Sequence, residues 1–245
     1  MSRHYYIPRP FFDTREAVLD QYKMLQADEQ PRPRIRQWLK QCLQDTTVTL
    51  PVYAITDYQW VLNFLYSYRG SADTFSAYRR DLERLLQWSW FVQEQSVFKH
   101  KRADMEAFID FCRKPYKRWI GLKNVARFKH QDGEKRPNPD WRPFIGHLSK
   151  KDRHAGELPT KADYQLSQGA LKVMFGILSS FYHFLQQEEI VEVNPVVLIR
   201  QKSKFIRQEA TAPTIRRLSD QQWQTVIQLV KTQAQQEMKQ ERTVF

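Results

Sequence analysis

Apolar residues recur at helical spacing along most of this chain, most regularly between residues 171 and 185. Eight apolar side chains of that segment fall on one side of an α-helix, namely Leu171, Met174, Phe175, Ile177, Leu178, Phe181, Tyr182 and Leu185. A stripe this wide needs partners on several sides, as the central helix of a bundle has. The pattern therefore predicts an all-α fold, built as a helical bundle.

Shorter amphipathic segments precede and follow this helix. They predict helices over about 13–27, 33–43, 56–69, 73–93 and 102–113, and from 219 onward. In the fourth segment Phe75, Tyr78 and Leu82 share one face, while Arg79, Arg80, Glu83, Arg84 and Gln87 share the other. The fifth segment places Met105, Phe108, Ile109 and Cys112 on its apolar face.

Capping and turn residues mark where these helices begin and end. Asp13 with Glu16, Thr56 with Gln59, and Ser219 with Gln222 have the spacing of N-terminal caps. Residues 46–55 form a β-like run that Pro51 interrupts, so we expect an extended linker there. Asn194-Pro195 predicts a turn that ends the long helix.

Positive charge gathers where the helical pattern stops. Between Arg113 and Arg153 there are thirteen Lys and Arg residues and four acidic residues, in a chain of net charge +12. Residues 114–160 also hold four of the seven glycines and five of the twelve prolines, which break helices. We therefore expect the basic stretch to be largely a loop or a set of short turns, either merely solvated or turned toward a polyanion such as nucleic acid. A second basic run covers residues 200–217.

Five aromatic residues lie inside the first basic stretch: Tyr116, Trp119, Phe128, Trp141 and Phe144. We expect them to fix the loop to the bundle, because a long loop needs apolar contacts to hold a shape. The alternative is that they stack on single-stranded bases.

The remaining composition narrows the possible chemistry. Two cysteines, Cys42 and Cys112, favour reduced thiols over a disulfide framework. Six histidines show no metal-ligand spacing, so we expect no metal and no cofactor, and His183 is expected in the core or at its rim. No apolar run approaches 18 residues. We expect a soluble cytoplasmic protein with no membrane partner.

Four motifs occur in a particular order over about residues 56–230. They are Thr74-x3-Tyr78-x3-Leu82, then Leu-x2-Phe-Tyr-x-Phe-Leu from Leu178 to Leu185, then Asn194-Pro195, and finally Leu218-Ser-x3-Trp223. Their order and spacing resemble the N-terminal half of a tyrosine recombinase of the phage-integrase family. The insertion at about 114–160 and the first 50 residues have no counterpart in that pattern.

The resemblance implies a division of the chain. Residues 1–55 would be an N-terminal helical extension, 56–199 a SAM-like core-binding domain carrying the basic insertion, 200–217 a basic linker, and 218–245 the start of a catalytic domain. The residues for strand cleavage would lie beyond Phe245. We therefore expect this chain to be inactive by itself, with no catalytic residue of its own.

The function that the resemblance implies is binding to double-stranded DNA. Such a portion clamps the duplex at recombination core sites during integration or excision of a mobile element, together with other protomers of the recombinase. The candidate DNA-binding residues are Arg79, Arg80, Lys123, Arg127, Lys129, Lys135, Arg136, Lys150, Lys151, Arg153, Gln168, Lys172, Lys202, Lys204 and Arg207. For Arg79, Arg80, Gln168 and Lys172 an ordinary solvated helix face is the competing interpretation. For the whole chain, the alternative is an all-helical basic module that binds RNA or protein without recombinase activity.

Overall fold

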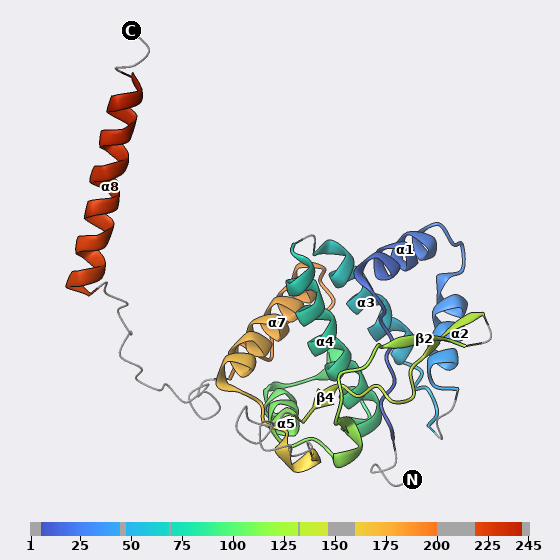
Figure 1. The fold of residues 1–245 in the computed structure, drawn as a ribbon. Coiled ribbons are helices and arrows are strands. Elements are labelled where there is room, and N and C mark those ends of the chain that lie inside the picture. Colours follow the sequence, from blue (N-terminus) through green and yellow to red (C-terminus); the bar gives the residue numbers. More distant parts are fainter. Residues whose placement is uncertain are drawn as a thin grey trace. The chain divides into compact units, whose positions relative to one another are not determined.

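A computed structural model describes residues 6–44, 48–68, 70–131, 133–146, 160–199 and 219–241. The described chain is mostly helical, as predicted (Figure 1). It divides into two compact units, Met1–Arg207 and Gln208–Phe245. The α-helices are α1 (Arg15–Gln26), α2 (Pro31–Cys42), α3 (Ala54–Ser67), α4 (Ala72–Trp88), α5 (Arg102–Arg113), α7 (Gln168–Gln187) and α8 (Asp220–Glu241).

Helix α7 packs against α3 and α4 in the core of the first unit. All eight residues of its predicted apolar stripe are buried, which confirms that stripe. The four apolar residues predicted for α5 are buried as well. After α4 the chain continues as a π-helical turn, η1 (Ser89–Gln93), and a short 3-10 helix, η2 (Val97–Lys99).

The N-terminal residues belong to the same core as α4 and α7. Phe11 and Phe12 are fully buried, and the Phe12 ring stacks on Tyr58 of α3 with centroids 4.7 Å apart. Helix α2 adds Ile35 and Leu39 to this core. Residues 6–44 therefore share one hydrophobic core with the helices that follow residue 54.

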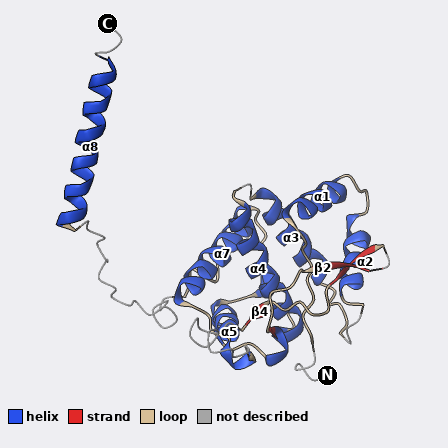
Figure 2. Ribbon diagram, in the orientation of Figure 1, coloured by secondary structure: helices blue, strands red, loops and turns tan. Residues whose placement is uncertain are grey.

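The basic stretch, predicted to be largely a loop or a set of short turns, also contains short strands that were not predicted (Figure 2). Strand β1 (Ile120–Gly121) pairs in parallel with β4 (Phe144–Ile145), and β2 (Phe128–Gln131) forms an antiparallel hairpin with β3 (Glu134–Pro137). Gly133 closes the hairpin at φ +79°, a left-handed conformation that glycine adopts without strain. Two further 3-10 turns, η3 (Lys117–Trp119) and η4 (Lys161–Asp163), flank these strands.

Aromatic side chains hold this stretch against the bundle. Trp119, Phe128, Trp141 and Phe144 are buried. The Phe128 ring stacks on Trp38 of α2, with centroids 5.8 Å apart. This confirms the expectation that the aromatics fix the segment, and it leaves these four rings unavailable for stacking on bases.

The structure corrects two of the three predicted caps. Thr14, not Asp13, caps α1 by accepting a hydrogen bond from the backbone N–H of Ala17. Helix α3 begins at Ala54, so Thr56 lies inside the helix rather than at its start. The third cap is confirmed, because Ser219 and Gln222 exchange backbone-to-side-chain hydrogen bonds of 3.0 and 3.2 Å.

The turn at Asn194-Pro195 is also confirmed. The Asn194 side chain donates to the Ser179 carbonyl of α7 (2.9 Å), and its oxygen accepts from the backbone N–H of Val196 (3.0 Å). This buried side chain holds the end of the first unit against α7.

Candidate nucleic-acid interface

Helix α4 runs through the centre of the first unit, and its polar face is largely covered. Glu83, Arg84 and Gln87 are buried, while Arg79 and Arg80 are partly exposed. The N-terminal segment 6–13 and residues 127–143 of the basic stretch hydrogen-bond to these side chains. Glu83, Arg84 and Gln87 thus lie beneath segments that are distant in sequence.

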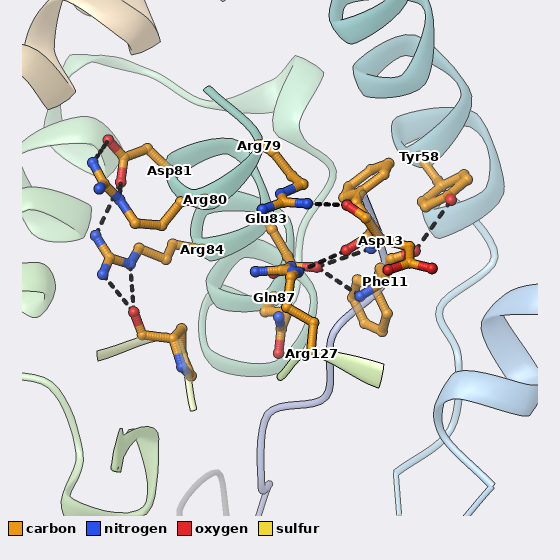
Figure 3. A network of polar contacts seen from close by, with 12 residues as sticks. Phe11, Asp13, Tyr58, Arg79, Arg80, Asp81, Glu83, Arg84, Gln87 and Arg127 are labelled. Carbon is orange, nitrogen blue, oxygen red and sulfur yellow. Dashed lines mark hydrogen bonds and ion pairs between the residues drawn. The ribbon is translucent and has the colours of Figure 1, made fainter. Parts of the chain in front are cut away.

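Glu83 is the centre of this covered region (Figure 3). Its Oε1 accepts hydrogen bonds from the backbone N–H groups of Phe11 (2.6 Å) and Phe12 (3.1 Å). Its Oε2 pairs with the guanidinium of Arg127, whose Nε donates to the Phe12 carbonyl (2.7 Å). One carboxylate thus joins α4, the N-terminal segment and the basic stretch.

Arg127 was predicted to contact phosphates, and the structure gives it an internal role. Its side chain is only 15% exposed, and its guanidinium lies 4.6 Å from the centre of the Trp141 ring. A buried ion pair is costly to break because the remaining charge stays desolvated. Arg127 therefore holds the basic stretch onto α4, and its largely buried charge is paired with Glu83 inside the protein.

Asp81 binds two arginines of α4, Arg80 and Arg84, as Glu83 binds Arg127. Its Oδ1 accepts from Arg80 Nε and from Arg84 Nη1, each at 2.9 Å. Arg84 Nε donates to the Pro143 carbonyl (2.9 Å), and its guanidinium lies 4.4 Å from the centre of the Phe144 ring. Arg84 is buried by these contacts, whereas the Arg80 side chain stays 42% exposed and is oriented by Asp81.

The pKa directions agree with these environments. The hydrogen bonds that Arg80 donates to the Asp81 carboxylate raise the pKa of Arg80, so this guanidinium stays charged. Burial, together with the nearby charge of Arg127, lowers the pKa of Arg79 to about 10. Arg79 donates to the Asp13 carbonyl and still carries its charge near neutral pH.

A groove of about 460 Å³ opens beside this cluster, and we call it the basic groove. It runs between α4, the basic stretch and the start of α7. Its charged lining consists of Arg79, Arg80, Arg84, Arg127, Arg142 and Asp73. Asp81 and Glu83 pair with the lining residues Arg84 and Arg127. Counting them with Asp73, the groove has five arginines and three carboxylates, so its net charge is positive.

The start of α7 forms the other wall of the groove. Ala170 and Met174 line it, as do Tyr164 and Leu166 just before the helix. Ser167 caps this helix by accepting from the Ala170 N–H (3.1 Å). The predicted pair Gln168 and Lys172 lies in the same two turns without lining the groove; Gln168 is half-buried and Lys172 is exposed.

The other predicted residues lie elsewhere. Lys123 and Lys129 are exposed, and Lys129 lies on the hairpin with Lys135, which pairs with Asp13, and Arg136, which pairs with Glu134 at 3.0 Å. None of these four lines the basic groove. Lys150, Lys151, Arg153, Lys202, Lys204 and Arg207 lie outside the described residues.

Arg142 is a groove residue that the sequence did not single out. Its Nη1 donates to the carbonyls of Pro139 and Trp141, both at 2.6 Å. Burial lowers its pKa, and the charge of Arg9 lowers it further. Only its place directly after the buried Trp141 could have suggested it, because an aromatic anchor fixes its neighbour near the bundle surface.

Other titratable groups of the described residues have structural surroundings. Burial raises the pKa of the Cys42 and Cys112 thiols, which keeps them protonated. His100 is buried between Ser89 Oγ (3.1 Å) and the Tyr182 hydroxyl (2.9 Å), and burial lowers its pKa to about 4. His183, expected in the core or at its rim, is exposed and so lies outside the core. In the described part of the chain, no group of three His, Cys, Asp or Glu side chains is placed to hold a metal ion.

Of the helices that the structure describes, none combines the length and the apolar character needed to cross a membrane.

Neither family models, nor curated proteins, nor solved structures give a match to this chain. Its function has to be inferred from the basic groove and from the residues around it.

Proposed function

We propose that this chain binds double-stranded DNA through the basic groove, as the N-terminal and core-binding portion of a site-specific tyrosine recombinase. Such a portion would hold the duplex at recombination sites of a mobile element, alongside further protomers. The proposal assigns DNA binding, not strand cleavage, to these residues. It rests on the resemblance in motif order and on the chemistry of the groove.

The observation that carries the proposal is the convergence of arginines between the N-terminal halves of α4 and α7. Arg80 and Arg142 combine solvent access with fixed orientation, through Asp81 and through backbone carbonyls respectively. Planar guanidinium groups held in this way suit phosphate oxygens, which they contact through two parallel N–H groups. Duplex DNA presents such phosphates at regular spacing along both walls of a groove.

Helix α7 adds two favourable contributions at the same place. The N-terminus of a long helix carries a partial positive charge, which attracts anions near its first turn. Lys172 is exposed one turn further along and can approach a second phosphate. Gln168 has the amide group that reads adenine in a major groove, and it gives this helix a means of sequence recognition.

The test is the salt dependence of binding to a labelled duplex, measured by fluorescence anisotropy. Each lost phosphate contact lowers the slope of log K against log salt by about 0.9. Arg80→Gln combined with Lys172→Gln should therefore reduce the slope by about 1.8 and weaken binding. The matched control is Lys99→Gln with Lys114→Gln, which removes two exposed charges that lie neither in the groove nor on α7.

Equal slopes for the groove variant and the control variant would contradict the proposal. Competition with a structured RNA distinguishes it from the alternative of an RNA-binding module. If the RNA displaces the duplex at equal or lower concentration, the partner is RNA rather than DNA.

A further inference from the structure

A second, smaller cavity of about 140 Å³ lies between the end of α2 and the β2–β3 hairpin. Its polar lining comprises two arginines and three glutamines, namely Arg9, Gln41, Gln44, Gln131 and Arg136. No carboxylate of the described residues lines it. We call this cavity the Arg9 crevice.

The hairpin beside the crevice brings like charges together. Its register places Lys129 opposite Arg136. Like charges directly across an antiparallel pair destabilise it. Glu134 offsets Arg136 and Asp13 offsets Lys135, while Lys129 has no ion-pair partner in the described part of the chain. An external anion on this face of the hairpin would remove the remaining repulsion.

The crevice adjoins the basic groove through one carbonyl group. Arg9 Nη1 donates to the Pro139 carbonyl at 2.8 Å, and Arg142 Nη1 of the groove donates to the same oxygen at 2.6 Å. Two guanidinium groups are thus held at a single neutral acceptor. Arg9 of the crevice and Arg142 of the groove are therefore linked through the Pro139 carbonyl.

We propose that the Arg9 crevice binds a backbone phosphate of the same duplex, outside the segment that the basic groove contacts. Guanidinium and amide N–H groups together match phosphate oxygens and read no base. The C-terminal end of α2, at Gln41 and Gln44, opposes an anion with a partial charge of about half an electron. Two full guanidinium charges outweigh it. The inference rests on the proposed function, since it needs a duplex in the groove.

The experiment compares a short duplex of about 12 bp with one of about 30 bp, in salt titrations between about 50 and 200 mM. The variant is Lys129→Gln with Arg136→Gln, which leaves the buried Arg9 in place. On the long duplex its slope should fall by about 0.9, the amount for the one phosphate of the crevice, so that salt weakens it about threefold less than the wild type over this range. On the short duplex its slope should equal that of the wild type.

The groove variant and the control variant of the preceding section complete the design. The groove variant should lose slope on both duplexes, and the control on neither. If the hairpin variant retains the wild-type slope on the long duplex while the groove variant loses it, the crevice is not a phosphate site and the proposed function stands. Equal losses on both duplexes would place the crevice inside the groove's own contact and overturn the inference. If the wild type bound neither the short nor the long duplex, both proposals would be overturned.

Discussion

Helix α4 buries most of its polar face, whereas α7 leaves its polar face exposed. On α4, Glu83, Arg84 and Gln87 are covered by residues 6–13 and 127–143. On α7, Lys172, Gly176, Ser180 and His183 remain exposed opposite the apolar stripe. Both helices are amphipathic and both border the basic groove.

The difference shows that basic residues around one groove can have two unrelated tasks. Arg84 and Arg127 organise the fold, since their guanidinium groups are bound to carboxylates, carbonyls and aromatic rings inside the protein. Arg80 and Lys172 keep access to solvent, and so to a ligand. Substitutions of the first kind should change stability, and those of the second kind should change the salt dependence of binding.

The largest effect is expected for Glu83→Gln. The change leaves the Arg127 guanidinium without a carboxylate in a desolvated site, where loss of one partner costs about 3 to 5 kcal/mol. The free energy of unfolding, measured by urea denaturation, should fall by that amount. The control Glu106→Gln removes a partly exposed i,i+4 pair with Arg102 and should cost about 0.5 kcal/mol or less.

A double variant keeps this prediction testable if the single one folds poorly. Glu83→Gln combined with Arg127→Met removes both charges, so its loss of stability should be smaller than the sum of the two single losses. Strict additivity, or a loss for Glu83→Gln no larger than for Glu106→Gln, would show that the pair does not hold the basic stretch to α4.

The second prediction concerns His100, which joins the end of α4 to the buried face of α7 through Ser89 and Tyr182. Burial lowers its pKa to about 4, while an unfolded histidine titrates near 6.5. The stability that neutral His100 contributes is therefore fully present above pH 6.5 and is lost as the pH falls toward 4. The loss approaches about 3 kcal/mol.

The measurement is the difference in unfolding free energy between the wild type and His100→Gln across this pH range. Asp57, whose pKa burial raises to about 6, titrates in the same window but equally in both proteins, so it cancels from the difference. The advantage of the wild type should shrink by up to about 3 kcal/mol between pH 7 and 4. A constant difference would mean that His100 is not held neutral in the fold.

The periodicity of the sequence predicts which apolar residues are buried, but not which charged residues of α4 are buried. The buried residues of α5 and α7 follow from helical spacing alone. The burial of Glu83 and Arg84 does not, because their partners, Phe12 and Pro143, lie 71 and 59 residues away in the chain. The hairpin had a local signal, since Asp132-Gly133 is a dipeptide that favours a two-residue turn between strands.

The smallest expected effect is that of a substitution on the exposed face of α7. Lys172→Gln removes one charge from the solvent-facing surface of α7, at a position that α-helix propensity tolerates well. Its unfolding free energy should stay within about 0.5 kcal/mol of the wild type, as is usual for exposed sites. Its salt slope with duplex DNA should nevertheless fall by about 0.9, the amount expected for one phosphate contact. The same two measurements on Arg127→Gln should give the reverse, a large loss of unfolding free energy with little change in the salt slope. If Lys172→Gln left the slope unchanged, α7 would be a scaffold like the covered part of α4, and DNA contact would fall to Arg80, Arg142 and the hairpin.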